Sequence, residues 1–357
     1  MLDRRKSRAV MLSTSAPGGM WSVVEGYRKE GVFERWDVIL IVTHVRGSIA
    51  ARIGVFVSSV LRLTAALMSG KVALVHCHCA AYGSFFRKAI LASIARTFGV
   101  PVILHLHGGA MQKFYSQLFR PFRRFVSSQL YKASIVLVLT ESWREFVQAV
   151  APGSKIMVLP NYVSLPQNVN RPRSGPALQV LFLGLVAEQK GIYELLSAFK
   201  LAIADVPQLK LVVAGDGEIE KARVFARGLG LETKVEFCGW VSGQEKETLF
   251  ATSEIFVLPS HHEGLPVSIL EAMSWCLAVV ATDVGGVPDV IRDQVDGLIV
   301  SPGDVASLAA SLVRLGKDES MRTAMAAAGR SRVEHAFSAD VVLPRLENLY
   351  ASMAPNG

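Results

Sequence analysis

The sequence predicts an α/β protein built from two Rossmann-like domains, each a doubly wound parallel sheet. Short apolar runs, typical of buried parallel strands, alternate with helical patterns along the chain. This alternating series occurs twice, and a polar, proline-rich stretch at 166–176 separates the two occurrences. A length of 357 residues also suits two domains. We therefore place the domains at residues 1–170 and 171–339.

The first series contains six apolar runs that we expect to be strands, with helical patterns between them. The strands are predicted at 10–13, 38–43, 72–78, 102–107, 135–139 and 156–159. The helices are predicted at 21–29, 49–69, 84–98, 113–132 and 141–150.

The second series repeats this pattern and ends in two further helices. Its strands are predicted at 178–183, 209–214, 234–237, 255–258, 278–281 and 298–300. Its helices are predicted at 191–204, 218–228, 243–251, from Pro266 onward, 286–292, 304–314, 319–335 and 340–353. Ligands of open parallel sheets bind outside the carboxyl ends of the strands, where loops rich in glycine or histidine follow several of these runs.

The charge of the chain is divided unevenly between the two halves. Residues 1–170 hold 21 Lys and Arg against 7 Asp and Glu, whereas residues 171–357 hold 17 against 23. The first half therefore carries +14 and the second −6. This asymmetry indicates that the first half meets something anionic: a membrane surface, a lipid phosphate or nucleic acid.

Cysteine content and hydropathy bear on the compartment. Four cysteines in a chain of this length do not make a disulfide framework, so we expect a reducing compartment. The early apolar run at 9–12 is too short for the core of a signal peptide. The apolar segment at 53–68 is interrupted by Arg62 and is predicted to fall short of a membrane span. A soluble or peripheral protein is expected.

The stretch at 258–273 carries two carboxylates around the start of a helix. Glu263 and Gly264 follow an apolar strand, Pro266 suits the first turn of a helix, and Glu271 lies about one turn inside it. A helix N-terminus attracts phosphate, and acids beside it cannot serve to attract that anion by charge. The two acids are better suited to accept hydrogen bonds from hydroxyls on either side of the phosphate. A ligand with a sugar, a diphosphate and a ribose has this layout. Taken alone, the pair would be a surface Glu and an ordinary helix Glu.

Histidines mark the ends of two strands in the first series. His107 precedes two glycines that permit close approach of the backbone, and taken alone it would be a capped loop histidine. His105, two residues earlier, is expected to be structural. In the run at 76–79, H-C-H-C, strand alternation sends the histidines and cysteines to opposite faces, which argues against one tetrahedral zinc site. No metal site is predicted.

The segment E-G-L-P-V-S-I-L-E-A-M at 263–273 resembles the E-x7-E motif of retaining GT-B glycosyltransferases, specifically family 4 (group 1) of bacterial polysaccharide assembly. Other motifs follow in the family's order: P-G-G at 17–19, H-L-H-G-G at 105–109, G-x5-K-G at 184–191, G-D-G at 215–217 and T-D-V-G-G-V-P-D-V-I at 282–291. The resemblance implies two domains facing a cleft, with a C-terminal helix at about 340–357 packing back on the first domain. The first domain would bind the acceptor and the second the donor.

The resemblance also implies roles for the acids and the lysine. Glu263 would lie beside the donor sugar near the reacting centre, and Glu271 would bind the ribose hydroxyls. Lys190 would neutralise the departing diphosphate, a role suited to a compact ammonium group. Gly264 and Leu265 would offer backbone N–H groups to the sugar or the phosphate.

Four more residues take roles from the same resemblance. Gly184 opens the loop that would face the diphosphate, and the backbones of Gly18 and Gly19 would reach the diphosphate or the acceptor. His107 would contact the donor sugar or position the acceptor. The G-D-G loop at 215–217 would lie near the donor base.

Two positions depart from the family pattern. Leu185 stands where the family usually has an Arg after the loop glycine, so one phosphate-binding charge is absent or is supplied elsewhere, by Arg144 or by another Arg of the first domain. Cys276 and Ala278 stand where the family has glycine and proline.

The implied function is transfer of a hexose from a nucleotide-sugar to a lipid-linked oligosaccharide, with retention and without a metal or other cofactor. GDP-mannose is the favoured donor and a UDP-hexose the next; a polyprenyl-diphosphate saccharide is the favoured acceptor. A sugar-nucleotide epimerase and, more remotely, a basic nucleic-acid-binding protein are the alternatives.

The expected location is the cytoplasm, peripheral on the inner face of the cytoplasmic membrane. The aromatic and basic helix predicted at 113–132 would either meet this anionic surface or turn an aromatic face to the core. Pro121 would kink or break that helix.

Overall fold

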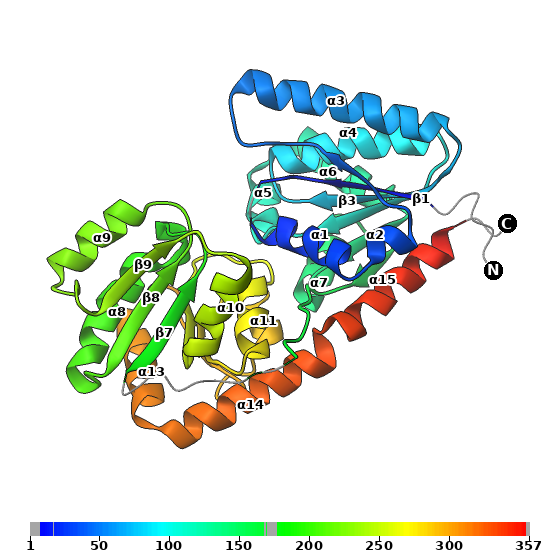
Figure 1. Ribbon diagram of the computed structural model, residues 1–357. Coiled ribbons are helices and arrows are strands. Elements are labelled where there is room, and N and C mark those ends of the chain that lie inside the picture. Colours follow the sequence, from blue (N-terminus) through cyan, green and yellow to red (C-terminus); the bar gives the residue numbers. More distant parts are fainter. Residues whose placement is uncertain (1–7, 17, 168, 170–176, 355–357) are drawn as a thin grey trace. The chain divides into compact units, whose positions relative to one another are not determined.

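The structure is a computed structural model that describes residues 8–16, 18–167, 169 and 177–354 (Figure 1). The chain divides into two compact units. Unit 1 comprises Met1–Tyr162 with Ala339–Gly357, and unit 2 comprises Val163–Ser338. The sequence placed the corresponding boundaries at 170/171 and 339/340. Residues 168 and 170–176 of the predicted linker, and Pro17 of the first glycine loop, lie outside the described residues.

Unit 1 is organised around a six-stranded parallel sheet with the strand order β2-β1-β3-β4-β5-β6. Its strands are β1 Arg8–Ser13, β2 Ile39–Val42, β3 Val72–Cys79, β4 Val102–Leu106, β5 Ile135–Val138 and β6 Ile156–Val158. Parallel strands need crossover helices, which cover both faces of the sheet. This is why β3 and β4 are buried along their whole length and contain almost no charged residue.

The helices of unit 1 follow the predicted order with two differences. They are α1 Gly19–Lys29, α2 Val32–Arg35, α3 Ile49–Met68, α4 Gly83–Thr97, α5 Met111–Gln117, α6 Arg120–Tyr131, α7 Glu141–Val150 and α15 Ala339–Met353. The short helix α2 was not predicted. The helix predicted at 113–132 is divided in two, and the kink or break expected at Pro121 is confirmed as a break: the chain is extended at Phe119, and Pro121 then occupies the first turn of α6.

The same break separates the aromatic residues that the sequence placed on one face. Phe114, on α5, is buried in the core, whereas Phe122 is 51% exposed and Phe125 is 36% exposed on α6. The core face is therefore confirmed on α5, whereas α6 presents an exposed aromatic and basic face.

Helix α3 corrects the expectation that the apolar segment falls short of a membrane span. It runs from Ile49 to Met68, and among the described helices it is the one long and apolar enough to cross a membrane by length and composition. The prediction was wrong because it began at Ile53 and treated Arg62 as an interruption. The Arg62 guanidinium instead donates a hydrogen bond to the carbonyl of Leu40 at 3.4 Å.

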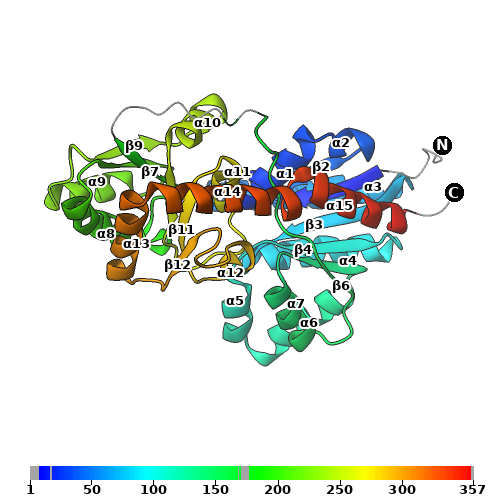
Figure 2. The same cartoon turned by 90° about the horizontal axis from the view of Figure 1, so that it is seen from below.

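Helix α15 returns to unit 1, as the predicted C-terminal helix required, and packs against its sheet (Figure 2). Arg345 donates a hydrogen bond to the carbonyl of Val158 at 2.6 Å. Glu347 pairs with Arg35 at 2.7 Å, and the Tyr350 ring is fully buried.

Unit 2 is built on a second parallel sheet, with the order β12-β11-β10-β7-β8-β9. The strands are β7 Leu178–Leu183, β8 Leu209–Ala214, β9 Val235–Gly239, β10 Ile255–Leu258, β11 Ala278–Thr282 and β12 Leu298–Val300. The helices are η2 Glu188–Lys190, α8 Ile192–Asp205, α9 Ile219–Gly228, α10 Gly243–Thr252, α11 Val267–Ser274, α12 Val287–Val290, α13 Val305–Lys317 and α14 Glu319–Ala336. All these elements except the one-turn η2 were predicted.

Candidate active site

The topology of unit 2 locates a site before any side chain is considered. The chain leaves β7 toward β8 on one side and later returns to β10 on the other side. The connections that follow β7 and β10 therefore diverge, which leaves a crevice at the carboxyl ends of these two strands. The loop from β7 carries Lys190, and the loop from β10 carries Glu263.

The two loops are held together by backbone contacts. The His261 N–H donates to the carbonyl of Gln189 at 3.0 Å. Gly191 has φ +71°, and a Cβ placed there would lie 2.0 Å from the carbonyl oxygen of Pro259. Glycine is therefore required at this position by both the conformation and the close approach.

Glu263 is the centre of a small polar cluster. Its Oε1 accepts from Lys190 Nζ at 2.5 Å and from the hydroxyl of Ser260 at 2.7 Å. The Glu263 side chain is 10% exposed and that of Lys190 23%. The other carboxylate oxygen, Oε2, has no hydrogen-bond partner among the residues that the structure describes. The Glu263 carboxylate is thus fixed in position, and its Oε2 can still accept hydrogen bonds.

A third loop, which follows β11, packs against the backbone of Glu263 and Gly264. The Gly286 N–H donates to the carbonyl of Gly264 at 2.6 Å. A Cβ on Gly285, which has φ +55°, would lie 1.9 Å from the carbonyl oxygen of Glu263. Glu263 is therefore positioned from three strands, through β7, β10 and β11, which is the kind of rigid support a functional carboxylate needs.

Helix α11 begins directly after this segment. Pro266 is the residue before the first helical residue, one position earlier than the first-turn position that the sequence predicted. Leu265 is buried. Gly264 and Leu265 thus lie at the N-terminus of α11, where the predicted anion contacts would be made.

Glu271 lies inside α11 and has a partner that sequence reasoning missed. Its Oε1 accepts from Lys246 Nζ at 2.6 Å, with side-chain exposures of 22% for Glu271 and 31% for Lys246. Lys246 comes from α10, the helix that follows β9. A lysine on a polar surface helix is ordinarily solvated, so no sequence signal distinguished Lys246 from its neighbours.

The loop from β7 also contains Gly184 and the leucine that replaces a family arginine. The Gly184 N–H donates to the carbonyl of Ala214 on β8. Leu185 is 36% exposed and lies close to Gly217, since a Cβ on Gly217 would be 3.1 Å from Leu185 Cδ1. Arg144, one candidate for the missing charge, forms a surface ion pair with Glu141 on α7 of unit 1.

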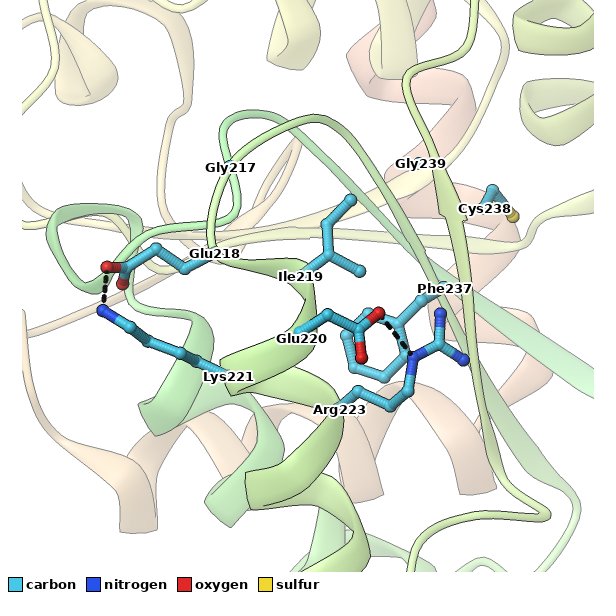
Figure 3. A pocket seen from close by; sticks show the side chains of 9 residues that line it. All are labelled: Gly217, Glu218, Ile219, Glu220, Lys221, Arg223, Phe237, Cys238 and Gly239. Atoms are coloured by element: carbon cyan, nitrogen blue, oxygen red, sulfur yellow. Dashed lines mark hydrogen bonds and ion pairs between the residues drawn. The ribbon is translucent and has the colours of Figure 1, made fainter.

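A hollow of about 510 Å³ lies at the carboxyl ends of β8 and β9, next to the G-D-G loop (Figure 3). The Arg223 guanidinium lies over the Phe237 ring, 5.4 Å from its centroid, and meets Glu220 at 3.5 Å. Burial and the neighbouring Glu236 raise the pKa of Cys238 to about 11, so its thiol stays neutral near neutral pH. The lining of this hollow thus combines an aromatic ring, backbone groups and charged side chains.

In unit 1, the predicted glycine pair and His107 follow the strands β1 and β4. Gly18, with φ +144°, precedes α1, and Gly19 is its first residue. Among the residues that the structure describes, nothing lies within 4 Å of a Cβ built on either glycine. His107 is half-buried, and its Nε2 forms a hydrogen bond with Nδ1 of His78 at 2.8 Å.

His107 belongs to a group of four histidines, which we call the histidine cluster: His76, His78, His105 and His107. Nδ1 of His76 lies 2.5 Å from the Tyr350 hydroxyl, and its Nε2 lies 3.2 Å from Nδ1 of His105. Cys77 and Cys79 lie in the opposite core, so the predicted alternation along β3 is confirmed.

Burial is the main cause that lowers the pKa of every histidine in this cluster. The pKa values of His76 and His107 fall to about 3, and those of His78 and His105 fall well below the ordinary value. The charge of Lys88 lowers the pKa of His107 further, and a hydrogen bond with the Asn161 side chain raises it in part. The imidazoles are therefore neutral near pH 7 and can offer hydrogen bonds but no charge.

Ring nitrogens of His76, His78 and His105 lie within 4.8 Å of one another, a spacing compatible with a metal ion. The rings of His76 and His78 are stacked at 4.2 Å with an interplanar angle of 26°. A metal ion bound to imidazole lies in the plane of the ring, and both nitrogens of His76 already have hydrogen-bond partners. This geometry favours a hydrogen-bonded stack over a metal centre.

Two family models match adjoining parts of the chain. The model for group 1 glycosyl transferases matches residues 168–332, and the model for glycosyltransferase family 4 matches residues 21–166. An uncharacterised glycosyltransferase of Methanocaldococcus jannaschii is 27% identical over 299 residues, which cover 78% of this chain and 75% of that protein. These matches extend over both units.

A second relative and a solved structure agree with this. The UDP-Gal:alpha-D-GlcNAc-diphosphoundecaprenol alpha-1,3-galactosyltransferase of Escherichia coli is 24% identical over 84% of this chain and 80% of its own. HepE from Anabaena, crystallised with UDP-glucose, has a TM-score of 0.76 at 19% identity, covering 97% of this chain and 99% of its own. The predicted class of two Rossmann-like domains is thereby confirmed, and the chain belongs to the group 1, family 4 glycosyltransferases with the GT-B fold.

Proposed function

We propose that the chain transfers a hexosyl group from a nucleotide-sugar to a hydroxyl of a lipid-linked saccharide, with retention of the anomeric configuration. The observation that carries this proposal is the Lys190–Glu263 pair at the switch point of unit 2, beside the start of α11. A leaving diphosphate needs a cation, and a sugar needs a fixed acceptor for its hydroxyls. Both groups are present at one place and are held from three strands.

The order of the loops along the sheet of unit 2 supports a donor pose. The hollow at β8 and β9 would hold the base, and Glu271 would accept the ribose hydroxyls after Lys246 releases it. Lys190 would turn from Glu263 to the diphosphate, with Gly264 and Leu265 nearby at the N-terminus of α11; the Gly184 N–H is already bonded to the carbonyl of Ala214, so Gly184 would serve by leaving room for the diphosphate. Glu263 would then use both oxygens for the donor sugar. Each protein ion pair would thus be exchanged for a contact with the donor.

The transfer step would follow a front-face course. The bond between the anomeric carbon and the phosphate oxygen breaks, and a bond from the acceptor oxygen forms on the same face of the sugar. The acceptor proton passes to an oxygen of the leaving diphosphate. Lys190 and the N-terminus of α11 stabilise the charge that develops there, and Glu263 orients the sugar. Gly18, Gly19 and His107 of unit 1 would position the acceptor or the sugar by hydrogen bonds.

The substrates of related proteins support our proposals for the donor and the acceptor. GDP-mannose was the donor favoured by the sequence; the relatives that use UDP-Gal or bind UDP-glucose support a UDP-hexose equally. The galactosyltransferase relative acts on a diphosphoundecaprenol-linked sugar. A polyprenyl-diphosphate saccharide therefore remains our proposed acceptor, at the cytoplasmic face of the membrane.

A panel of nucleotide-sugars tests the donor first. We expect one donor to raise the melting temperature, and its labelled hexose to appear in the lipid fraction when membrane extract is added. NMR of the product linkage should show the anomeric configuration of the donor. Conversion of the donor without any acceptor would instead identify an epimerase, and an inverted linkage would contradict the proposed course.

A further inference from the structure

Helix α3 presents an apolar surface that the rest of unit 1 leaves uncovered. Three of its side chains, Ile53, Val57 and Leu61, are 58%, 50% and 66% exposed. Its buried residues, Ser59, Leu63 and Leu67, are few and lie toward its C-terminal half. A helix that is apolar on all sides is normally buried in a core or in a membrane, so an exposed one indicates an interaction surface.

The apolar surface continues beyond α3. Helix α4 packs beside α3, and α6 lies on the far side of α4, where Phe86 of α4 contacts Phe122 and Phe125 (Figure 1). Phe119 of α6 is 80% exposed. We call this surface the α3–α6 face and define it by its exposed apolar side chains: Ile49, Ile53, Val57, Leu61, Met68, Phe119, Phe122 and Phe125.

The helices that carry the α3–α6 face have charges of one sign. Residues 38–140, which contain the whole face, hold 12 Lys and Arg and no Asp or Glu. Arg52, Arg62, Arg120 and Arg124 are exposed on the same helices. The nearest acids in the sequence are Asp37 and Glu141, outside this stretch. The exposed apolar side chains of α3 and α6 thus share their helices with cations and with no acid, which matches a surface that combines hydrocarbon with negative charge.

This charge pattern selects among possible occupants. In a symmetric dimer the same patch would meet itself, and the arginines of the two copies would face one another without any acid to separate them. A nucleic acid would satisfy the arginines but would leave the aliphatic side chains of α3 without an apolar partner. An anionic bilayer satisfies both the arginines and the aliphatic side chains.

We propose that the α3–α6 face docks unit 1 on an anionic lipid bilayer, with α3 lying along the interface. Helix α3 would not cross the bilayer, because Leu63 and Leu67 hold it against the unit. Ile53, Val57 and Leu61 would enter the boundary between head groups and acyl chains, and the arginines would meet lipid phosphates. The inference deepens the proposed function, since it brings the acceptor-binding unit to the surface where a lipid-linked acceptor lies.

Vesicle flotation tests the proposal on the full chain. We expect binding to vesicles of phosphatidylcholine with phosphatidylglycerol, and much weaker binding to phosphatidylcholine alone. The triple variant Ile53→Gln, Val57→Gln and Leu61→Gln should lose affinity by about a hundredfold or more, since three apolar side chains no longer leave water. Glutamine keeps the helix propensity, and the exposed positions leave the core unchanged.

A matched control comes from unit 2, where Leu201 and Val224 are exposed to a similar degree, at 53% and 62%. The variant Leu201→Gln with Val224→Gln should bind vesicles as the wild type does. The variant Arg52→Gln with Arg124→Gln should weaken binding at low salt and lose that difference at high salt. Equal loss in the unit 2 variant, or full binding by the triple variant, would overturn the proposal.

Two further measurements separate this proposal from the transferase proposal. Light scattering should show that the wild type is a monomer. If the wild type is instead a dimer that does not bind vesicles, and the triple variant is a monomer, the α3–α6 face is an interface with a second copy. Donor binding by thermal shift and transfer to a short-chain, water-soluble acceptor should be unchanged in the triple variant. If the wild type floats but transfers to no acceptor, the proposed function fails while the membrane surface stands.

Discussion

The ionisable side chains near the ends of the central strands differ between the two units in charge and in burial. Unit 2 holds the lysine–glutamate pairs Lys190–Glu263 and Lys246–Glu271, all four side chains partly exposed. Unit 1 holds the histidine cluster, whose rings are buried or half-buried and neutral. The same sheet topology thus supports a charged site in one unit and an uncharged one in the other.

The difference has a physical meaning. A partly exposed ion pair is worth little by itself, so either partner can exchange it for a ligand group at low cost. A buried neutral imidazole can give or take a hydrogen bond but resists protonation. We infer that unit 2 supplies the charge needed at a diphosphate, and that unit 1 supplies shape and hydrogen bonds. The experiments below test this division, beginning with the largest expected effect.

Acidification should destabilise unit 1 selectively. The pKa of His76 and His107 is about 3 in the folded protein, against 6.5 for an ordinary histidine. The unfolded chain therefore takes up protons that the folded unit refuses, and stability falls as the pH drops from about 6.5 toward 3. Each histidine contributes at most about 1.4 kcal/mol per pH unit in this window, so stability should fall by several kcal/mol on acidification. Hydrogen exchange should show early loss of protection in β3 and β4.

The variant His76→Phe isolates the cause. It removes one titrating group, and the slope of stability against pH between about 6.5 and 3 should become shallower, even if neutral-pH stability falls because Tyr350 loses its partner. Loss of protection in β7 and β8 of unit 2 at the same pH would contradict the assignment to the histidine cluster.

The variant Glu263→Gln should abolish most of the transfer. Glutamine keeps the size of the side chain but removes the charge that holds Lys190 and that we propose orients the sugar, so we expect the rate to fall by about a thousandfold. Donor binding, measured by thermal shift, should persist because Glu271 and Lys190 remain. Initial rates with a labelled donor measure the effect.

An exposed carboxylate of the same unit provides the control. Asp205 pairs with Lys317 at 3.4 Å on the surface, with side-chain exposures of 63% and 56%. The variant Asp205→Asn should retain full activity. A Glu263→Gln enzyme with near wild-type rates would remove Glu263 from the reacting centre.

The sequence predicted most of the fold because local patterns carry it. Buried parallel strands such as 178–183 and 209–214 are continuous apolar runs, and their predicted and observed bounds coincide. The kink or break expected at Pro121 is observed as a break, and the helix predicted at 49–69 is observed as α3. Only the apolar length of α3 was underestimated, because an arginine in an apolar run can either interrupt it or, as Arg62 does, donate to a backbone carbonyl. Helix α2 was too short to show a period.

The candidate site was predicted in part, for a related reason. Lys190, Glu263 and their glycines lie in loops with a recognisable spacing, and the structure brings Lys190 and Glu263 together. Lys246 reaches Glu271 from another helix, and the cluster of His76 with His105 forms between two strands. Such pairings depend on tertiary register, which a single sequence does not display.

The variant Gly191→Ala tests whether the charged site depends on the close packing of its loops. A Cβ would lie 2.0 Å from the Pro259 carbonyl oxygen, in a left-handed conformation that alanine disfavours. We expect a loss of about 3 kcal/mol in stability, within the range of strained backbone substitutions. Thermal denaturation measures it.

Gly303→Ala separates strain from crowding. Gly303 has φ +80°, similar to Gly191, but nothing lies within 4 Å of its Cβ position. This variant should lose only about 1 kcal/mol, the cost of the left-handed conformation alone. Equal losses in the two variants would show that the contact with Pro259 does not constrain the loop.

The variant Lys246→Met addresses the second ion pair and has the smallest expected effect. If Lys246 holds Glu271 only until the ribose arrives, removing the lysine leaves the donor free to bind without displacing a partner. If Lys246 also meets the donor, its loss weakens binding. Because the pair is only partly exposed and a nearby cation favours an anionic donor, we expect the second outcome, with KM for the donor raised about tenfold and kcat unchanged.

Lys317→Met, on the surface pair, should leave both constants unchanged. A lower KM in Lys246→Met would show instead that the lysine competes with the donor for Glu271, and the contrast between an exchangeable charged site and a fixed neutral one would then be sharper.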